Sequence, residues 1–460
     1  MMGGRQVMQD SLFYEFNLER HVPEGHLLRA IDQISDFGFV REHLEPFYSS
    51  IGRPSVDPEL MVRMLIVGYC FGIRSERRLC QEVHLNLAYR WFCKLGLEGE
   101  VPDHSTFSKN RHGRFRESGL FREVFETIVR QCIADGLVGG DGFAVDASTI
   151  EANANRGEGD FGTEPLPPEV MHRRAVQEYF DTLDDAAFGA ASELPPKYLS
   201  PVDPASRWTR TFRSGRAYYS YSLNYLVDCA NAIIVDVEGS TAIRPAELTV
   251  TRRMIERVKE RHGIMPRKLM GDTAYGSAAM LHWLVEDKDI EPHIPVLQQR
   301  QRTDGVFARN EFKYYIEADH YICPGGKELK RFRTKGRAAR SVPSKDGTHR
   351  YYAKKSDCSS CNLKPWCCPK EPLRKIPRSI HENARDYTRR IAETEEFISS
   401  RNQRKKVEML FAHLKSIMKF GQLRLRGPTG INDEFLLAAI AQNLRKMAKL
   451  HSRRLQPSPA

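Results

Sequence analysis

The chain has 460 residues, of which 41% are hydrophobic and 28% charged, so its composition is that of a folded globular protein and excludes a disordered or fibrous one. The longest apolar run, residues 60–73, is interrupted by Arg63 and is too short to cross a bilayer, and residues 1–10 lack the apolar stretch of a secretory signal. The net charge of +11 is unevenly divided: residues 1–326 carry 38 basic and 47 acidic side chains (−9), whereas residues 327–460 carry 32 and 12 (+20). This asymmetry favours a polyanionic partner over the alternative of a basic surface that is merely solvated.

The first predicted region is helical. Residues 27–130 have the apolar spacing of amphipathic helices, and a glycine-rich turn at 136–140 ends them. Four arginines in this region either contact phosphate or line a solvated face, and their spacing slightly favours the solvated face: Arg74, Arg77, Arg78 and Arg90.

A mixed α/β region follows. The segment GFAVDAST from Gly142 predicts a strand, and the proline- and glycine-rich stretch 156–206 predicts a solvated excursion with one helix near 169–183. Alternation over 219–227, a turn and the segment IIVDV predict a β-hairpin. A helix (245–262), a strand ending in KLMGDTAYG, a helix (278–286) and a strand (293–296) then imply a mixed sheet, and two long helices follow at about 382–418 and 433–451.

Two aspartates have similar surroundings in this region. We expect Asp146 and Asp272 to lie at or just past the ends of apolar strands, where ligands bind in open α/β sheets. Two carboxylates there can hold Mg²⁺ together with substrate phosphate. For either aspartate alone, a helix-cap or turn role is the favoured interpretation.

A third carboxylate lies on the long helix. At 100° per residue, Val407, Leu410, Phe411, Leu414 and Met418 form an apolar stripe, and Arg404, Glu408 and Lys415 lie together along its edge. Such an edge can present a site next to a sheet. A solvated Arg404–Glu408 pair fits the helix geometry equally well.

Many segments occur in an order that resembles one family. They are HVPEGHLLRAID, GRPSVDPELMVRMLI, GIRSERRLCQEV, VPDHSTFSKNR, VDASTIEANANR, YSLNYLVD, MGDTAYGS and RKKVEMLFAHLK followed by RLRG. The chain resembles the DDE transposases of bacterial insertion sequences, in the branch with a helical amino-terminal domain and a cysteine-bearing insertion before the glutamate.

The resemblance implies an RNase H-like core with Asp146 on its first strand, Asp272 on its fourth and Glu408 on a following helix. Arg404, Glu408 and Lys415 match the family's glutamate signature at the correct spacing, but Arg401 stands where a tyrosine is expected. The implied cofactors are two Mg²⁺ or Mn²⁺ ions held by these three carboxylates. Asp228 is a rival acid, although its place at the end of a hairpin strand fits a turn better.

The implied partner is double-stranded DNA, at both the element ends and the target. Arg404, Lys415, Arg424 and Arg426 are the expected phosphate contacts. Because two element ends must be joined, a homodimer is expected. The expected location is the bacterial cytoplasm, at the nucleoid and with no membrane contact.

A cysteine cluster begins at Cys323. The spacing Cys358-x₂-Cys361 is typical of a metal knuckle, and Cys323 with Cys367 (or Cys368) can complete a tetrahedral Cys₄ zinc site. His320 offers a Cys₃His alternative, and free thiols or a redox pair remain open. We expect zinc to hold a small β-rich insertion whose basic loop, 327–355, grips DNA.

The sequence therefore predicts an α/β protein in five parts. They are a helical domain for end recognition or assembly (1–135), the first part of an RNase H-like core (136–300, with the loop 156–206), the basic cysteine-rich insertion (301–380), the glutamate helix with the C-terminal helix (381–452) and a tail (453–460). The predicted activity is metal-dependent cleavage at element ends and strand transfer to target DNA. The rivals are an inactive DNA-binding relative and an RNase H-like structure-specific nuclease.

Overall fold

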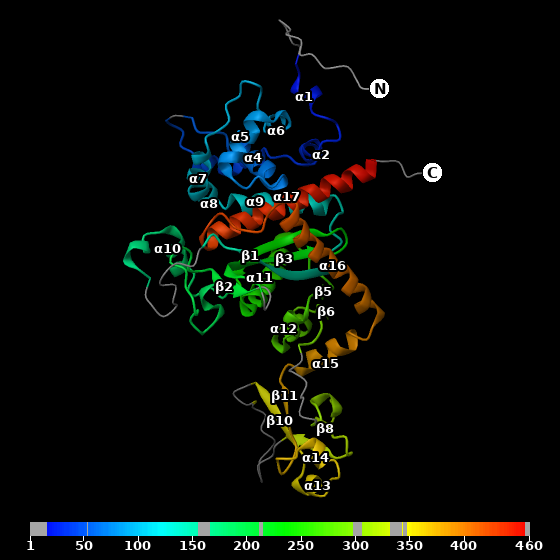
Figure 1. Ribbon diagram of the computed structural model, residues 1–460. Coiled ribbons are helices and arrows are strands. Elements are labelled where there is room, and N and C mark those ends of the chain that lie inside the picture. The colour runs from blue at the N-terminus through cyan, green and yellow to red at the C-terminus, as the bar shows by residue number, and fades with distance from the viewer. Residues whose placement is uncertain are drawn as a thin grey trace, which may run out of the picture. The chain divides into compact units, whose positions relative to one another are not determined.

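A computed structural model describes residues 16–52, 54–154, 166–210, 215–297, 306–331, 343 and 347–455 (Figure 1). The chain forms two compact units, which we describe separately. The first comprises Met1–Met265 and Lys405–Ala460, and the second comprises Pro266–Arg404. The five-part division made from sequence features stays a prediction.

The amino-terminal part of the first unit is helical, as predicted. Its helices are α1 (Leu18–His21), α2 (Leu27–Ile34), α3 (Phe39–Leu44), α4 (Pro58–Cys70), α5 (Glu76–Leu85), α6 (Leu87–Phe92), α7 (His104–His112), α8 (Arg114–Glu117) and α9 (Leu120–Ala134). Three of these helices have an N-cap residue whose side chain accepts a hydrogen bond from a backbone N–H of the first turn. The N-cap residues are Asp57 for α4, Ser75 for α5 and Asp103 for α7.

Four strands form the sheet of the first unit: β1 (Gly142–Glu151), β2 (Arg207–Arg210), β3 (Ala217–Asp228) and β4 (Ile233–Thr241). Strand β3 pairs antiparallel with β1 along one edge and with β2 and β4 along the other. The predicted hairpin is confirmed as β3–β4. Almost every residue of these two strands is buried, which fits a sheet covered on both faces.

Helices cover the two faces of this sheet. Helix α11 (Arg244–His262) lies on one face, where Glu247 accepts a hydrogen bond from Ser222 Oγ. Helix α17 (Gly427–Leu455) lies on the other, where a Cβ on Gly239 would come within 2.3 Å of Ile431. Helix α17 also contacts α2, α4 and α9, so it joins the helical region to the sheet (Figure 1). The helix that was predicted within the loop 156–206 is present as α10 (Arg174–Asp181).

Both long C-terminal helices differ from the sequence-based prediction. The first is two helices, α15 (Glu382–Ile391) and α16 (Glu395–Ser416), and Thr394 Oγ1 accepts a hydrogen bond from Phe397 N at the break. The second, α17, begins six residues earlier than expected. Its first-turn amides find distant acceptors: Gly427 N donates to Asp203 and Thr429 N to Glu178.

The second unit contains a parallel strand pair and a separate antiparallel sheet. Strand β5 (Lys268–Met270) pairs with β6 (Glu291–His293), slightly before the predicted 293–296, and α12 (Ala278–His282) and a π-helical turn (Trp283–Asp287) connect them. The antiparallel sheet contains β7 (Lys313–Tyr315), β8 (His320–Ile322), β9 (Glu328–Arg331), β10 (Thr348–Tyr352) and β11 (Lys375–Ser379), with α13 (Lys355–Ser359) and α14 (Lys364–Cys367) between its last two strands. A small core of Tyr321, Leu329, Tyr351 and Ile376 holds this sheet.

The protein thus has a mixed α/β fold with a helical amino-terminal region, and its strands pair both antiparallel and parallel. Within the described ranges, no helix is both long enough and apolar enough to cross a membrane.

Candidate active site

Asp146 lies in the middle of a strand. We expected it at or just past a strand end, and this was wrong: β1 continues for five residues beyond it, to Glu151. Residues 147–149 extend the strand because they pair with β3. The Asp146 side chain is half-buried, and its Oδ1 accepts a hydrogen bond from Ala147 N over 2.9 Å.

Helix α16 packs on the face of the sheet that carries the Asp146 side chain. Tyr225 is directly opposite Asp146 in the β1–β3 pairing, and directly opposed residues project to the same face. The Tyr225 ring stacks on Phe411 of α16 with centroids 4.9 Å apart and planes 7° from parallel. The predicted apolar stripe of this helix is the side that packs, because Val407, Phe411 and Leu414 are buried.

Two lysines fix the direction of α16 along β1. Lys406 Nζ donates to Cys229 O over 2.5 Å, next to the start of β1, and Lys415 Nζ donates to Thr149 O over 3.2 Å, near its end. Burial lowers the pKa of the Lys415 ammonium. The helix therefore runs in the same direction as the strand.

Glu408 is three residues before Phe411, the residue of α16 that stacks on Tyr225 opposite Asp146. Glu408 is seven residues before Lys415, which places it on the same side of the helix about 10 Å back along its axis. Asp146 is three residues before Thr149, about 10 Å back along the strand. Glu408 is exposed. The first unit thus places α16, which carries Glu408, against the same face of the sheet as the Asp146 side chain.

Asp272 belongs to the second unit and follows β5 by two residues. Its Oδ1 accepts a hydrogen bond from Ala274 N over 2.7 Å, so it caps the short 3₁₀ turn Thr273–Tyr275. The cap role favoured for a lone aspartate is therefore present, and a metal role stays a prediction. The loop is tightly packed, because a Cβ on Gly276 would lie 2.1 Å from Pro295 O.

The predicted phosphate-contacting residues have different surroundings. Arg424 and Arg426 are exposed on the segment before α17, and Arg426 Nε donates to Asn153 O over 2.7 Å. Arg404 is half-buried on α16, and Arg401, at the expected tyrosine position, is exposed. Lys415 is tied to β1, as described above.

The rival acid Asp228 has the structural role expected of it. It is the last residue of β3 and is 1% exposed. Its two oxygens accept hydrogen bonds from Gly140 N and Ala230 N, which fixes the turns at this end of the sheet.

The predicted zinc cysteines gather at one end of the antiparallel sheet. A Cβ on Gly325 would lie 3.6 Å from Cys361 Sγ and 3.7 Å from Cys323 Sγ, so both sulfurs face the same space. Burial and the neighbouring Cys368 thiol raise the pKa of both Cys358 and Cys367, so these three thiols lie near one another.

Several features bear on metal binding by these cysteines. Lys327 N donates to Cys323 Sγ, and burial together with the Cys368 thiol raises the pKa of Cys367 to about 12. A cluster of thiols suits Zn²⁺ by its chemistry. No three cysteines of the described part have sulfurs mutually within 4.8 Å, so binding would have to draw them together.

One donor cluster was not predicted from the sequence. Donor atoms of Glu291, His293 and Glu396 lie within 4.8 Å of one another. Glu396 forms ion pairs with Arg267 (2.6 Å) and Lys268 (2.8 Å), and these bases lower its pKa to about 2. The cluster is thus an ion-pair network that fixes the start of α16 to β5 and β6. Glu291 and His293 lie two residues apart on β6, but Glu396 comes from α16, more than 100 residues later, so no local spacing could have added it to them.

Two parts of the chain match known protein families. Residues 16–113 match a family described as a transposase domain (DUF772), and residues 322–448 match one described as a transposase DDE domain. The second match includes the cysteines, Glu408 and most of α17, whereas Asp146 and Asp272 lie outside both matches. No solved structure matches the chain.

The matched domains are those of transposases, which move DNA, and they imply phosphoryl transfer and divalent metal ions. The chain is a DDE transposase.

Proposed function

We propose that this transposase cuts DNA at the ends of its element and joins the freed strands to target DNA, with Asp146, Asp272 and Glu408 as its catalytic carboxylates. The observation that carries the proposal is the alignment of α16 with β1. Lys406 and Lys415 anchor this helix along the strand, and Phe411, three residues after Glu408, stacks on Tyr225 opposite Asp146. This packing supports a shared role for the two carboxylates in a chain that carries a transposase DDE domain.

The donor set fits the metal that the family implies. Carboxylate oxygens are the ligands that Mg²⁺ and Mn²⁺ prefer, and no soft donor accompanies them in the proposed set. Asp146 is half-buried and Glu408 exposed, so both remain accessible to ions and to DNA. When bound, a pair of such ions stabilises the charge that develops on the attacking and leaving oxygens of an in-line displacement.

The reaction has two chemically similar steps. In the first, a water oxygen attacks the phosphorus at the element end, and the 3′-oxygen leaves and takes up a proton. In the second, that 3′-hydroxyl loses its proton and attacks a phosphorus of the target strand, which releases a 3′-hydroxyl on the target. Arg404 and Lys415 contact phosphates beside the cut, and Lys415 also holds α16 against β1. Arg424 and Arg426 contact the DNA backbone farther along the duplex.

The proposal also includes the oligomeric state of the transposase and the role of its cysteine-rich insertion, residues 301–380. Because two ends must react together, we propose that two chains act as a homodimer on paired ends. The cysteine cluster binds one Zn²⁺ through Cys323, Cys358, Cys361 and either Cys367 or Cys368. The basic segment 327–378, with 16 basic and 4 acidic residues (+12), then supports DNA binding.

A cleavage and joining assay tests the proposal. A labelled duplex with the DNA that flanks the reading frame is incubated with Mg²⁺ or Mn²⁺ and wild-type protein or the variants Asp146→Asn, Asp272→Asn and Glu408→Gln. Glu395→Gln is the matched control, because Glu395 is an exposed acid at the start of the same helix.

We expect metal-dependent 3′-end nicks and joined products that each catalytic variant loses and the control keeps. Cutting without joining would instead indicate a structure-specific nuclease. Tight binding with no cutting would indicate an inactive relative and would direct attention to Arg401.

A further inference from the structure

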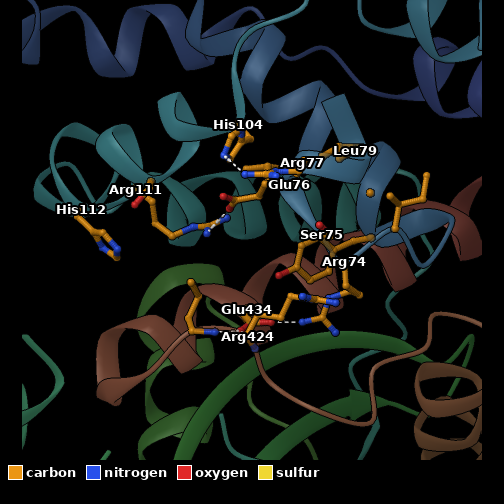
Figure 2. Close-up of a pocket in the computed structure, with 16 residues that line it drawn as sticks. Arg74, Ser75, Glu76, Arg77, Leu79, His104, Arg111, His112, Arg424 and Glu434 are labelled. Atoms are coloured by element: carbon orange, nitrogen blue, oxygen red, sulfur yellow. Dashed lines mark hydrogen bonds and ion pairs between the residues drawn. The ribbon is translucent and has the colours of Figure 1, made fainter. Parts of the chain in front are cut away.

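A pocket of about 300 Å³ lies in the first unit between α5, α7 and the segment before α17 (Figure 2). Its polar lining comes from three parts of the chain that are far apart in sequence. These residues are Arg74, Ser75, Glu76 and Arg77 at the start of α5, His104, Ser108, Arg111 and His112 from α7, and Arg424 and Glu434 from the C-terminal region.

Two of the lining arginines are nearly inaccessible. The Arg74 side chain is 6% exposed, pairs with Glu434 and lies over the Phe420 ring at 3.9 Å. The Arg111 side chain is 7% exposed and pairs with Glu76. Within the described residues, Arg74 Nη1 and Arg111 Nε have no hydrogen-bond partner. A buried guanidinium nitrogen without an acceptor is costly, and it leaves positive charge in the pocket wall that a bound anion would compensate.

The rim of the pocket adds more positive charge. Arg77 and Arg424 are exposed at its edge, so four guanidinium groups face two carboxylates, Glu76 and Glu434. Both carboxylates are already paired with the buried arginines, as Figure 2 shows. The pocket therefore keeps a net charge of about +2 with its histidines neutral.

The N-terminal backbone of α5 adds to the attraction of this pocket for an anion. Ser75 caps this ten-residue helix by accepting a hydrogen bond from Arg78 N. The amides of Glu76 and Arg77 belong to the first turn, where helical geometry provides no acceptor for them. A helix N-terminus of this kind attracts phosphate through its amides and its dipole.

His112 adds no positive charge to the pocket lining at neutral pH. Burial and the positive charges of Arg174, Arg111 and Arg116 lower its pKa to about 4. The imidazole is therefore neutral at pH 7, and an added anion would meet no carboxylate that lacks a partner in this lining.

We propose that this pocket binds a backbone phosphate of the element-end DNA. The inference deepens the proposed function and rests on it for the identity of the ligand. It assigns to Arg77 and to the α5 N-terminus a role that the sequence left open, and it places Arg424 beside them.

The pocket is connected to the strand that carries Asp146. Leu423 N donates to Glu151 O over 2.8 Å, and Glu151 N donates to Gly421 O over 3.3 Å, so the segment before Arg424 is bound to the end of β1. Glu151 is five residues from Asp146, about 17 Å along a strand. That length corresponds to about five base pairs of a duplex, at about 3.4 Å each. One DNA end can therefore reach both places.

Binding of a labelled end duplex to the full chain, measured by fluorescence anisotropy at several salt concentrations, is the first test. Arg77→Gln and Arg424→Gln should each weaken binding about tenfold. Each should also reduce the slope of log affinity against log salt by about 1. Arg78→Gln is the matched control: it removes the same charge from the next residue, whose exposed side chain pairs with Glu82 outside the pocket.

A second measurement identifies the phosphate. Single uncharged methylphosphonates are placed along the duplex, and each is measured with the wild type and with the double variant Arg77→Gln, Arg424→Gln. One position, roughly five base pairs from the cut, should weaken wild-type binding and leave the double variant unaffected. Strictly additive losses at every position would overturn the pocket assignment.

The outcomes separate this inference from the proposed function. A wild type that binds, cuts and joins DNA, with pocket variants that behave like Arg78→Gln, would refute only the pocket. A wild type that binds through the pocket but neither cuts nor joins would refute the proposed chemistry and support the pocket. A wild type that does not bind the duplex would refute both.

Discussion

Asp146 and Asp272 are both preceded by apolar residues, yet their backbones differ. Asp146 lies inside a strand whose amides pair with β3, so its side chain has no helix to cap. Asp272 begins a 3₁₀ turn and caps it. Asparagine can accept the same hydrogen bonds at both positions, and it is a good cap residue. Loss of activity in the two Asn variants would therefore report the missing charge rather than a lost fold.

Another aspartate makes stability depend on pH. Asp203 is fully buried, and this burial raises its pKa to about 7 although Tyr221 and Gly427 donate to it. Because an unfolded aspartate titrates near pH 4, the folded state binds more protons between about pH 4 and 7. Stability that is present below pH 4 is therefore lost as the pH rises to 7.

The substitution Asp203→Asn should remove this dependence, since the amide stays uncharged. We expect the variant to gain roughly 2–4 kcal/mol relative to the wild type between pH 4.5 and 7.5, measured by chemical denaturation at both values. Asp433 has a similarly raised pKa, so both proteins should keep some residual pH dependence. A constant difference between them would contradict the assignment.

The arginines of the helical region show what residue type alone cannot predict. The sequence offered phosphate contact or a solvated face for Arg74 and Arg90. Arg74 is instead paired with Glu434, 360 residues away, and Arg90 is 3% exposed and donates to the carbonyls of Gly96, Leu97 and Gly99. Buried arginines need acceptors, and distant acceptors leave no local pattern.

At the scale of elements, the types of most helices and strands could be predicted, whereas their ends could not. Periodicity identifies the β3–β4 hairpin, α11 and the packed stripe of α16, because each pattern is local. The start of α17 depends on Asp203 and Glu178, which accept hydrogen bonds from residues 224 and 251 positions away. Caps supplied from such distances are not visible in a window of sequence.

The contact between α16 and β3 leads to a prediction about catalysis. Phe411 is 7% exposed and stacks on Tyr225 opposite Asp146. Phe411→Ala should lower the free energy of unfolding by about 3 kcal/mol. It should also slow strand transfer more than tenfold, because Glu408 would no longer be held in a fixed position relative to Asp146. Thermal unfolding and single-turnover joining measure the two effects.

The matched control is Met409→Ala on the same helix, where the side chain is 69% exposed. It should change neither quantity. Normal joining by a destabilised Phe411→Ala would mean that the alignment of α16 does not serve catalysis.

The cysteine cluster predicts a metal content. Anaerobically purified wild type should contain one zinc per chain, and Cys358→Ser or Cys361→Ser should lose it together with the stability of the β7–β11 sheet. Elemental analysis and hydrogen exchange of residues 306–379 measure these effects. Cys80→Ser, a half-buried thiol of α5, should retain zinc. Absence of zinc from the wild type would refute the site.

At the scale of the whole molecule, the helical region and the sheet of the first unit share α17. Its contacts with α2, α4, α9 and β4 join segments up to about 400 residues apart. Motif order along the chain predicted the family and the fold class. The proximity of α5, α7 and Arg424 in one pocket was not predictable, because it depends on this tertiary packing.

The charge asymmetry is also a property of the whole chain. Residues 401–426 carry 8 basic and 1 acidic side chains (+7), and this segment includes α16 beyond Ser400 and the arginines before α17. A basic segment next to Glu408 favours DNA at the proposed site over a small neutral substrate.

Iron-directed cleavage of the polypeptide tests the central claim most directly. Fe²⁺ with ascorbate and peroxide generates radicals at divalent-metal sites, and the fragments show which backbone segments surround the ion. The account predicts cuts near residues 146, 272 and 408 together, all suppressed by excess Mg²⁺ and all lost in Asp146→Asn. Cuts that omit residue 272, or that cluster at Glu291 and Glu396 instead, would contradict a single site built from the three carboxylates.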